Sequence, residues 1–329
     1  MIKVEFKRLG KPSEQLYLKN TEISERLKST EVLIEVLFFP INPADLLLVE
    51  GKYSSNLPLL PSSIGAECVA KVIKIGKNVK KFSINDIVIP LTRNNWVEKI
   101  KIDEVNLIKV HKDADLLQAS MLKVNPASAY LMLNNYIQLK KNDIIMQNAA
   151  NSGVGNYIIQ LANLYKIKTV NLVRRKEVIP SLKKIGAKEI LVESKKKSLS
   201  YKVKLIIDAK GGSDLDYWAS YLDDHGTIIN YGLLSGKNIQ INPGKLIFNN
   251  LSIKGFWLSL WLQRMSYREK SNLYKHLSNL VKNKILYTKV EKIYHITNIK
   301  DAVEKASAYK RSGKILVTFK KELINKFSI

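Results

Sequence analysis

Apolar positions in the first hundred residues form short blocks, a pattern that predicts β-strands. An alternating segment covers residues 1–8, and apolar blocks rich in β-branched residues cover 32–39, 68–75 and 86–89. Proline or glycine directly follows each of these last three blocks. Short strands punctuated in this way predict a compact, barrel-like β domain.

From about residue 115 the pattern changes, and strand-like blocks alternate with segments of helical periodicity. This alternation predicts an α/β domain with a parallel, doubly wound sheet. The predicted strands are 144–147, 169–173, 189–192, 204–208 and 227–231. The predicted helices are 116–135, interrupted at Asn125-Pro126, then 153–165, 178–185, 216–222, 266–282 and 299–309, before a closing strand at 314–319.

The turn after strand 144–147 is the strongest candidate for a nucleotide site. Against the dinucleotide-binding pattern G-x-G-x-x-G, its key positions are Ala150, Ser152 and Gly155, and Gly153 is an additional glycine. Small residues let backbone amides approach a pyrophosphate at a helix N-terminus. The alternative is a tight turn between strand and helix that binds no ligand.

The end of the second strand indicates which dinucleotide the domain binds. NAD-binding sheets place an acidic residue here, about 20 residues after the glycine loop, to hold the ribose hydroxyls. This chain has Arg174, Arg175 and Lys176 instead, and Glu177 is the first acid. Guanidinium groups bind a 2′-phosphate, so the expected cofactor is NADPH. An exposed basic turn without a ligand is the alternative.

The composition of the chain excludes several other classes of protein. The 329 residues are 46% hydrophobic and 25% charged, as in a globular chain long enough for two domains. No apolar run is long enough for a membrane span, and the start resembles neither a signal nor a transit peptide. A single cysteine, Cys68, excludes an internal disulfide and fits a reducing, cytoplasmic compartment.

Residues for metal or nucleophilic chemistry are sparse. The four histidines are scattered and no two have ligand spacing, so no metal site is expected. A nucleophile-elbow motif is also missing. Tyr136 and Lys140 match the Y-x-x-x-K pair of short-chain reductases, but they precede the nucleotide loop, and we interpret the match as coincidence.

The chain carries 54 Lys and Arg against 29 Asp and Glu, a formal charge of +25. Three interpretations remain open: compositional drift, attraction of an anionic substrate or carrier, and nucleic-acid binding. The lysines are spread along the whole chain without a nucleic-acid-binding motif, so no specific nucleic-acid partner is expected.

In seven motifs, the sequence resembles the zinc-free branch of the medium-chain dehydrogenase/reductase superfamily. It resembles the mitochondrial-type 2-enoyl thioester reductases of that branch more closely. The strings at 147–155, Gln-Asn-Ala-Ala-Asn-Ser-Gly-Val-Gly, and at 255–259, Gly-Phe-Trp-Leu-Ser, are the most specific. The others are Pro-Ile-Asn-Pro-Ala-Asp at 40–45, Glu-Gly-Lys-Tyr at 50–53, Gly-Ala-Glu at 65–67, Val-Asn-Pro-Ala-Ser-Ala-Tyr at 124–130 and Asn-Leu-Val-Arg-Arg at 171–175.

This resemblance implies a GroES-like β-barrel substrate domain, residues 1–118 completed by 285–329, and a Rossmann NADPH-binding domain, residues 119–284. It implies a homodimer formed through the edge strands of the Rossmann sheets. The implied activity is NADPH-dependent reduction of a trans-2-enoyl thioester, carried on coenzyme A or acyl carrier protein, in fatty acid metabolism.

The resemblance also assigns roles to individual residues. Tyr53 corresponds to the catalytic tyrosine, and Asn42 and Trp257 join it in the substrate pocket. At the cofactor, the resemblance implies that Asn125 contacts the nicotinamide and that Lys314 reaches the cofactor from the C-terminal segment. The pyrophosphate is assigned to Asn151, Ser152, Gly153 and Val154, and the 2′-phosphate to Arg174, Arg175 and Lys176. The nicotinamide and acyl pocket is assigned to Tyr231, Gly232, Leu233, Leu234, Phe256, Trp257, Leu258 and Ser259.

Tyr53 suits the expected chemistry, because a hydroxyl can protonate the α-carbon or orient the thioester oxygen after hydride transfer. An exposed loop tyrosine is the alternative. The chain departs from the family at Ser54, Arg175, Leu233 and Leu234, so the preferred acyl chain length stays open. Two other functions stay open: an NADPH quinone or 2-alkenal reductase, and a nonenzymatic NADPH-binding protein that associates with RNA.

Overall fold

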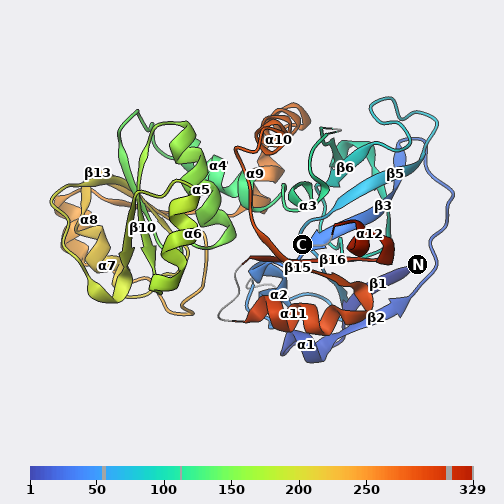
Figure 1. Cartoon of the computed structure of the whole chain (residues 1–329), viewed down its shortest axis with the longest axis horizontal. Coiled ribbons are helices and arrows are strands. Elements are labelled where there is room, and N and C mark those ends of the chain that lie inside the picture. Colours follow the sequence, from blue (N-terminus) through green and yellow to red (C-terminus); the bar gives the residue numbers. More distant parts are fainter. Residues whose placement is uncertain (54–56, 112, 309–312, 328–329) are drawn as a thin grey trace. The chain divides into compact units, whose positions relative to one another are not determined.

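The computed structural model describes residues 1–53, 57–111, 113–308 and 313–327. They form two compact units, one of residues 1–124 together with 266–329, the other of residues 125–265 (Figure 1). The first unit is therefore built from both ends of the chain, as the resemblance implies.

The first unit contains two sheets and several short helices. Its strands are β1 (Ile2–Phe6), β2 (Leu16–Asn20), β3 (Glu31–Pro40), β4 (Ser62–Ser63), β5 (Val69–Ile75), β6 (Ile87–Pro90), β7 (Lys99–Asp103), β8 (Leu107–Lys109), β15 (Val290–His295) and β16 (Lys314–Thr318). Its helices are α1 (Pro12–Gln15), α2 (Pro43–Val49), α3 (Leu116–Ala119), α10 (Tyr267–Lys282), α11 (Ile299–Ser307) and α12 (Lys321–Lys326), with 3-10 turns η1 (Glu104–Asn106) and η4 (Ile296–Asn298).

The larger sheet of this unit joins the two ends of the chain. Its order is β15-β16-β3-β5-β6-β8, with β7 paired to β3, while β2-β1-β4 form the smaller sheet. Strand β16 runs antiparallel to β3, with Val317 opposite Phe39. Apolar side chains of β3, β5, α11 and β16 share one buried core, because each strand and helix turns its apolar positions away from water. The predicted β domain is confirmed.

The second unit is a six-stranded parallel sheet between helices. Its strands are β9 (Ile144–Gln147), β10 (Lys168–Val173), β11 (Glu189–Val192), β12 (Val203–Asp208), β13 (Leu222–Asn230) and β14 (Ser252–Gly255). Its helices are α4 (Asn125–Asn134), α5 (Gly153–Leu164), α6 (Ile179–Lys184), α7 (Asp214–Ala219), α8 (Pro243–Phe248) and α9 (Leu258–Arg264), with 3-10 turns η2 (Lys176–Val178) and η3 (Glu193–Lys195).

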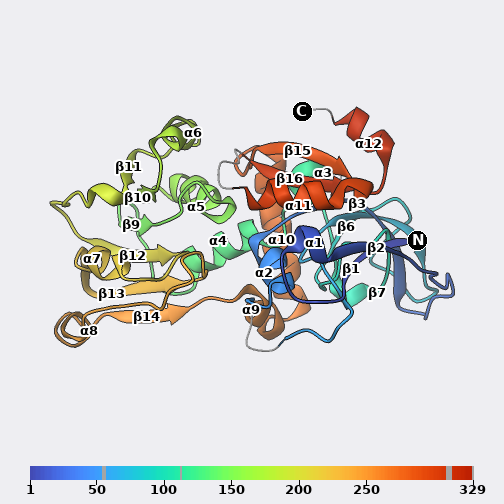
Figure 2. The ribbon, with the colours of Figure 1, turned by 90° about the horizontal axis from the view of Figure 1, so that it is seen from below.

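The sheet order is β11-β10-β9-β12-β13-β14, and every neighbouring pair is parallel. Helices α5 and α6 lie on one face, and α7 and α8 on the other (Figures 1 and 2). This is the doubly wound arrangement predicted from the strand-helix alternation. Gly186, at φ +97°, ends α6 where the sequence predicts it, because glycine takes this left-handed conformation without a steric penalty.

The structure differs from the predicted elements at Asn125-Pro126. The predicted break in helix 116–135 instead lies between α3, which ends at Ala119, and α4, which begins at Asn125. Proline fits the first turn of a helix, where its missing N–H costs no hydrogen bond. The last residue of the predicted helix 299–309 lies outside the described residues.

The boundaries between the units also differ from the expected 118/119 and 284/285. Helix α10 belongs to the first unit: the Ser278 Oγ accepts a hydrogen bond from the His111 backbone N–H at 2.9 Å. The Tyr274 hydroxyl donates to the Lys123 carbonyl at 3.0 Å. These partners lie more than 150 residues apart in sequence, so local patterning could not place the boundary. In the described part of the chain, no helix is long and apolar enough to cross a bilayer.

Candidate active site

The predicted nucleotide loop lies at the centre of the parallel sheet. Strand β9 lies between β10 and β12, where the order of connections reverses, and ligands of doubly wound sheets bind outside the carboxyl ends of such strands. The loop after β9 leads into α5, and the Ser152 hydroxyl caps this helix by accepting from the Gly155 N–H at 3.0 Å.

Gly155 has a steric reason to be glycine. A Cβ atom at this position would lie 2.5 Å from the Ala150 carbonyl oxygen and 2.8 Å from the Ala149 carbonyl oxygen. Only glycine allows the helix to approach the strand this closely, which is the packing role of the last glycine in dinucleotide-binding loops. The loop therefore has the backbone geometry that a bound dinucleotide needs.

A polar network that the sequence analysis missed lies beside this loop. The buried Asp208 carboxylate accepts from the Asn148 side-chain amide at 2.5 Å and from the Asn230 side-chain amide at 2.7 Å. These residues lie at the carboxyl ends of β12, β9 and β13. An available signal was that a polar residue ends or directly follows each of three apolar strands.

Tyr231 follows Asn230 and lies within reach of the nucleotide loop. Burial raises the pKa of Tyr231 to about 12, so its phenol stays protonated at neutral pH, and the Ser152 side chain hydrogen-bonds with it. The structure thus brings together two of the predicted cofactor contacts. The next two, Leu233 and Leu234, expose more than half of their surface, an unusual exposure for leucine.

The predicted phosphate-binding residues follow β10. Arg174 and Lys176 are exposed and Arg175 is half-buried. Because β10 pairs with β9 in parallel, these cations lie at the same edge of the sheet as the loop before α5. Upstream, the buried Asn171 accepts from the Gln147 side chain at 2.8 Å, which ties the two strands together.

The predicted pocket segment around residue 257 contains one buried and one exposed aromatic ring. Phe256 is buried, and its ring lies 6.5 Å from that of Tyr136. Trp257 is half exposed. The Tyr136 hydroxyl donates to the Gly255 carbonyl at 2.9 Å, so this tyrosine helps to pack the segment.

Tyr53, the predicted catalytic residue, lies in the first unit just after α2. Its side chain is half-buried, and the guanidinium of Arg93 lies over its ring, with Cζ 4.9 Å from the ring centroid. Arg93 Nη1 also donates to the Tyr53 hydroxyl oxygen at 3.3 Å. Sequence reasoning did not single out Arg93, because nothing local connects the two loops.

A cluster of buried polar residues surrounds Asn42 in the same unit. The Asn42 amide donates to Glu67 Oε1 at 2.9 Å, and Lys314 Nζ donates to the Asn42 side-chain oxygen. Asp45 accepts from the Asn42 N–H at 3.0 Å and caps α2. All four side chains are buried, so the predicted site residues Asn42 and Lys314 are brought together with two acids that the sequence analysis did not assign.

Burial perturbs the ionisation of this cluster. It raises the pKa of Glu67, against the opposing charge of Lys314. It also raises the pKa of Asp45, against the opposing charge of Arg93. The pKa of Lys123 falls to about 8, again because of burial.

Lys123 stabilises the first unit through two buried hydrogen bonds, and its loss has a measurable cost. Its Nζ donates to the Ala66 carbonyl at 2.7 Å and to the Thr92 carbonyl at 2.6 Å. We expect Lys123→Met to lower the free energy of unfolding by about 3 kcal/mol, since it leaves buried polar groups without a partner. Urea unfolding measures this loss. Lys80→Met, at an exposed lysine of the same unit, is the control, and equal losses for both variants would contradict the prediction.

Among the described residues, no group of three or more His, Cys, Asp and Glu side chains is arranged so that it could hold a metal ion. Cys68 is buried in the first unit, and burial raises the pKa of its thiol. Its thiol therefore stays protonated at neutral pH and is a poor metal ligand.

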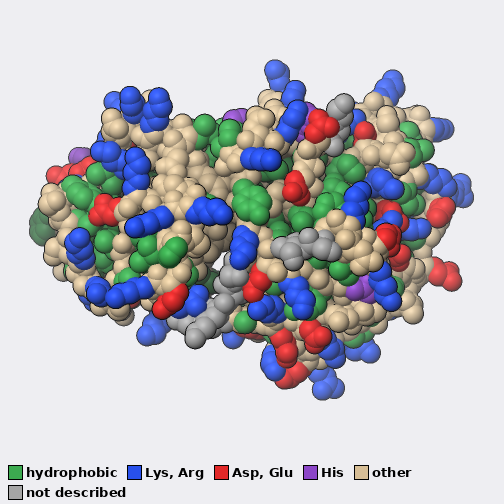
Figure 3. Space-filling model, in the orientation of Figure 1, with side chains coloured by type: hydrophobic (Ala, Val, Ile, Leu, Met, Phe, Trp, Pro, Cys, Tyr) green, Lys and Arg blue, Asp and Glu red, His purple; other side chains and the backbone are tan. Residues whose placement is uncertain are grey.

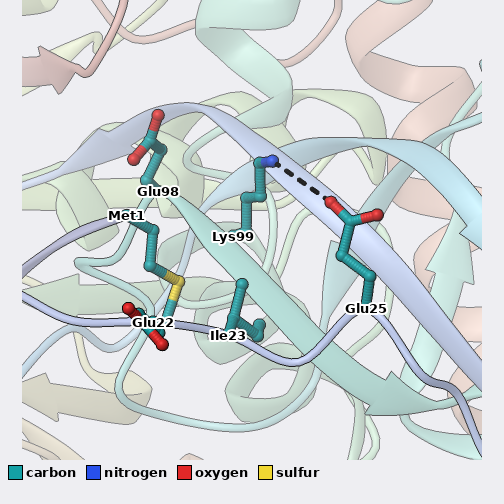
Figure 4. A pocket seen from close by; sticks show the side chains of 6 residues that line it. All are labelled: Met1, Glu22, Ile23, Glu25, Glu98 and Lys99. Carbon is teal, nitrogen blue, oxygen red and sulfur yellow. Dashed lines mark ion pairs between the residues drawn. The ribbon is translucent and has the colours of Figure 1, made fainter.

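A surface pocket lies apart from these residues. Figure 4 shows its lining, in which Lys99 points toward Glu25 with a 4.0 Å ion pair. Positive side chains are not confined to this or any other patch of the visible face, because Figure 3 shows lysines and arginines over both units with acids between them.

Two family models match the chain. An alcohol dehydrogenase GroES-like domain matches residues 28–111, and a zinc-binding dehydrogenase domain matches residues 153–275. Among solved structures, a putative NADPH:quinone reductase from Bacillus thuringiensis has a TM-score of 0.89 and 28% identity, covering 97% of this chain and 99% of that one.

Two further solved structures are enoyl thioester reductases. The Etr1p complex with NADP and crotonyl-CoA has a TM-score of 0.86 and 25% identity. The mitochondrial 2-enoyl thioester reductase Etr1p/Etr2p heterodimer from Candida tropicalis has a TM-score of 0.87 and 25% identity. Each match covers 97% of this chain and 99% of the other.

Several similar curated proteins are named enoyl-acyl-carrier-protein reductase, mitochondrial. The protein from Dictyostelium discoideum is 33% identical over 298 residues, which are 86% of this chain and 85% of that protein. One from Caenorhabditis elegans is 36% identical over 282 residues, 83% of this chain and 82% of that protein. The similarity thus spans both units, and the chain belongs to the family of the mitochondrial enoyl-acyl-carrier-protein reductases, in the zinc-free branch of the medium-chain dehydrogenase/reductases.

Proposed function

We propose that this protein is an NADPH-dependent oxidoreductase that reduces trans-2-enoyl thioesters to saturated acyl thioesters in fatty acid metabolism. The observation that carries the proposal is the similarity to enoyl reductases across both units. The geometry supports it, because the loop at Gly155 suits a dinucleotide and cations follow the second strand of the sheet. Fold alone would not distinguish the substrate, since related scaffolds host several reductions.

The residues of the second unit fit NADPH. The N-terminus of α5, with residues 151–154, holds the pyrophosphate, because unpaired amides and the helix dipole favour an anion there. Arg174 and Arg175 hold the 2′-phosphate with charge-assisted hydrogen bonds, and Lys176 adds a positive charge. When bound, NADPH supplies a hydride.

Further contacts come from segments that the resemblance assigns to the cofactor and the acyl pocket. Asn125 begins α4 and is proposed to contact the nicotinamide. The remaining residues assigned to this pocket are Tyr231, Gly232, Leu233, Leu234, Phe256, Trp257, Leu258 and Ser259. Exposed leucines and an exposed tryptophan in these segments suit an apolar acyl chain.

Tyr53 is the proposed acid for the substrate. Charge develops on the thioester oxygen when the β-carbon accepts hydride, and a hydroxyl donor stabilises it. The Tyr53 O–H then protonates the α-carbon or holds the thioester oxygen. Asn42 is proposed to line the substrate pocket and Lys314 to contact the cofactor, and their side chains share a buried hydrogen bond.

The reaction class is tested by following NADPH oxidation at 340 nm (absorbance of the reduced nicotinamide) with a short and a medium trans-2-enoyl-CoA. A quinone as the acceptor and NADH as the reductant are run beside them. Turnover of the enoyl thioesters with NADPH supports the proposal. Turnover with the quinone alone refutes it.

A quinone reductase is the second candidate function. The specific observation is the similarity to a putative NADPH:quinone reductase, which covers nearly all of both chains. Both candidates use the same nucleotide domain, so they differ only in the acceptor. The assay above separates them in one experiment.

Acyl carrier protein is the proposed carrier in addition to coenzyme A. Both carry negative charge, and a net charge of +25 attracts them. We expect KM for an enoyl-acyl-carrier-protein to rise with ionic strength, because salt screens this attraction. A KM that is insensitive to salt contradicts the proposed role of the charge. We propose no specific nucleic-acid partner, since lysines are spread over the chain.

We also propose a homodimer formed along β14, the outermost strand of the parallel sheet. Ile247 and Phe248 are 69% and 85% exposed in α8, and Ile253 on β14 is exposed as well. Apolar side chains beside a sheet edge suit the same surface of a second copy.

The dimer is tested with the double variant Ile247→Ser and Phe248→Ser. We expect monomers at concentrations where the unmodified protein has twice the chain mass, because two large apolar contacts contribute about 3–6 kcal/mol. Light scattering after size exclusion measures the mass. Leu59→Ser, at a leucine that is 93% exposed in the first unit, is the control and should leave the dimer intact. A monomeric unmodified protein would refute the dimer.

The proposed compartment is the cytoplasm, although the similar curated proteins are named mitochondrial. The proposal rests on a single, buried cysteine and the absence of disulfides that this entails. Cell fractionation with an antibody against the protein tests it, and recovery with the mitochondria would overturn it.

A further inference from the structure

We propose that Arg93 is a positioning residue for Tyr53: it holds the phenol ring, directs the hydroxyl proton toward the substrate, and stabilises the oxygen once that proton has left. This inference rests on the proposed function, in which Tyr53 is the proton donor. Arg93 lies in the loop between β6 and β7, and Tyr53 lies in the loop after α2. Both belong to the first unit.

Two contacts fix Tyr53 relative to the guanidinium. The Arg93 Cζ lies 4.9 Å from the centroid of the phenol ring, a cation–π contact that restrains the ring plane. Arg93 Nη1 lies 3.3 Å from the hydroxyl oxygen. This hydrogen bond is slightly longer than the optimum, and such bonds tighten when charge develops on the acceptor.

The direction of this hydrogen bond limits the acceptors to which the Tyr53 hydroxyl can donate its proton. A guanidinium only donates, so the Tyr53 oxygen accepts in this pair. The hydroxyl hydrogen is therefore directed to an acceptor other than Arg93. This arrangement suits a proton donor, because Arg93 does not compete with the substrate for the hydroxyl proton.

The loop that carries Arg93 is rigidly held. The Thr92 carbonyl, one residue before, accepts from Lys123 at 2.6 Å and from the Asn95 side chain at 2.9 Å. Trp96 is buried and stacks on Phe39 with a centroid distance of 5.0 Å. These contacts anchor the backbone on both sides of Arg93, which reduces the reordering of this loop that the reaction requires.

No described carboxylate forms an ion pair with Arg93. Its Nη2 is buried and has no hydrogen-bond partner in the described residues. Its charge does act on the buried Asp45, where it opposes the rise in the pKa of that carboxyl that burial causes. The guanidinium therefore places a positive charge beside the phenol oxygen, where it stabilises negative charge that develops during the reaction.

The hydride that NADPH supplies forms the new C–H bond at the β-carbon, and the electron pair of the double bond becomes an enolate on the thioester. The Tyr53 O–H bond breaks, its proton forms the C–H bond at the α-carbon, and its electron pair stays on the phenolate oxygen beside Arg93. A proton from solvent then restores Tyr53.

The test is a double-mutant cycle of Arg93→Met and Tyr53→Phe, measured as kcat and KM with a trans-2-enoyl-CoA. Arg93→Met should lower kcat about 10- to 100-fold and leave the NADPH dissociation constant unchanged. In the Tyr53→Phe background the same change should lower kcat by less than about twofold, because Arg93 acts through the hydroxyl. Equal losses in both backgrounds would overturn the proposal.

Two more variants separate positioning from a general loss of stability. Arg93→Lys keeps the positive charge and should recover part of the lost kcat. Lys81→Met removes a cation that lies 4.0 Å from the Tyr267 ring in the same unit, and it should leave kcat unchanged. If Lys81→Met reduces kcat as much as Arg93→Met does, the effect is structural and the inference fails.

A spectroscopic measurement tests the contact between Arg93 and Tyr53 independently of the proposed enzymatic activity. Fluorotyrosine placed at position 53 reports the surroundings of the ring by 19F NMR without any turnover. Arg93→Met should shift this resonance, and an unchanged resonance overturns the inference. If the unmodified enzyme does not reduce enoyl thioesters, the proposed function fails, whereas the 19F shift still decides whether Arg93 holds Tyr53.

Discussion

Replacing Tyr53 by phenylalanine is expected to lower kcat for trans-2-enoyl thioesters by about 10²–10⁴-fold, the usual contribution of a general acid. The variant keeps the ring that packs against Arg93 and removes only the hydroxyl. NADPH binding should not change, because the residues proposed to hold the pyrophosphate and the 2′-phosphate lie in the other unit. Steady-state kinetics with a short enoyl-CoA, together with an NADPH titration, measures both effects.

A matched control is available in Tyr17, whose hydroxyl donates to Glu5 at 2.9 Å in the first unit. Tyr17→Phe removes a hydrogen-bonded hydroxyl of similar kind, but one in β2 rather than in the proposed site. Its kcat should equal that of the unmodified enzyme. Full activity of Tyr53→Phe with an unchanged KM would show that Tyr53 is an ordinary loop tyrosine.

Replacing Arg174 and Arg175 together by alanine is expected to weaken NADPH binding about 100-fold or more. Hydrogen bonds to charged groups contribute about 1.5–3 kcal/mol each, and about 1.4 kcal/mol corresponds to a factor of ten. NADH lacks the 2′-phosphate, so its affinity should change by less than about threefold. The double variant therefore loses its preference for NADPH, and fluorescence titration of both nucleotides measures this loss.

Lys184→Ala tests whether any positive charge near the phosphate-binding turn is sufficient to strengthen NADPH binding. Lys184 is an exposed cation on α6, in the same unit, and it lies about ten residues beyond the phosphate-binding turn. Its loss should change NADPH affinity by less than about twofold, because salt screens exposed charges that make no direct contact. Equal weakening of NADPH and NADH in the arginine variant would contradict a role at the 2′-phosphate.

Local patterning predicted much of the second unit. Strands 144–147 and 189–192 have the predicted bounds, and α5 ends one residue earlier than predicted. Strands of a parallel sheet are buried on both faces and are continuous apolar blocks, while the helices between them have a clear period. The end of α6 at Gly186 and the glycine at 155 were also predictable, because each has a steric reason that is local to its turn.

The candidate site was predicted unevenly. Arg174 and Arg175 are proposed from their distance to Gly155 in the sequence, since a βαβ unit has a nearly constant length. Tyr53 came only from the resemblance, because a tyrosine in a polar loop has no periodicity to mark it. Glu67 and Lys123 were not assigned, because the sequence does not show that these charged residues are buried.

The sequence alone therefore determined the class of fold, the nucleotide loop and the identity of the expected cofactor, because each depends on residues within about 30 positions of one another. Tertiary structure decided the rest. Strand β16 pairs with β3 although about 270 residues separate them, and Lys314 reaches Asn42 through that pairing. Arg93 meets Tyr53 because two loops of one unit converge. Such contacts depend on strand register and on which elements share a core, and no local pattern of apolar and polar residues contains that information.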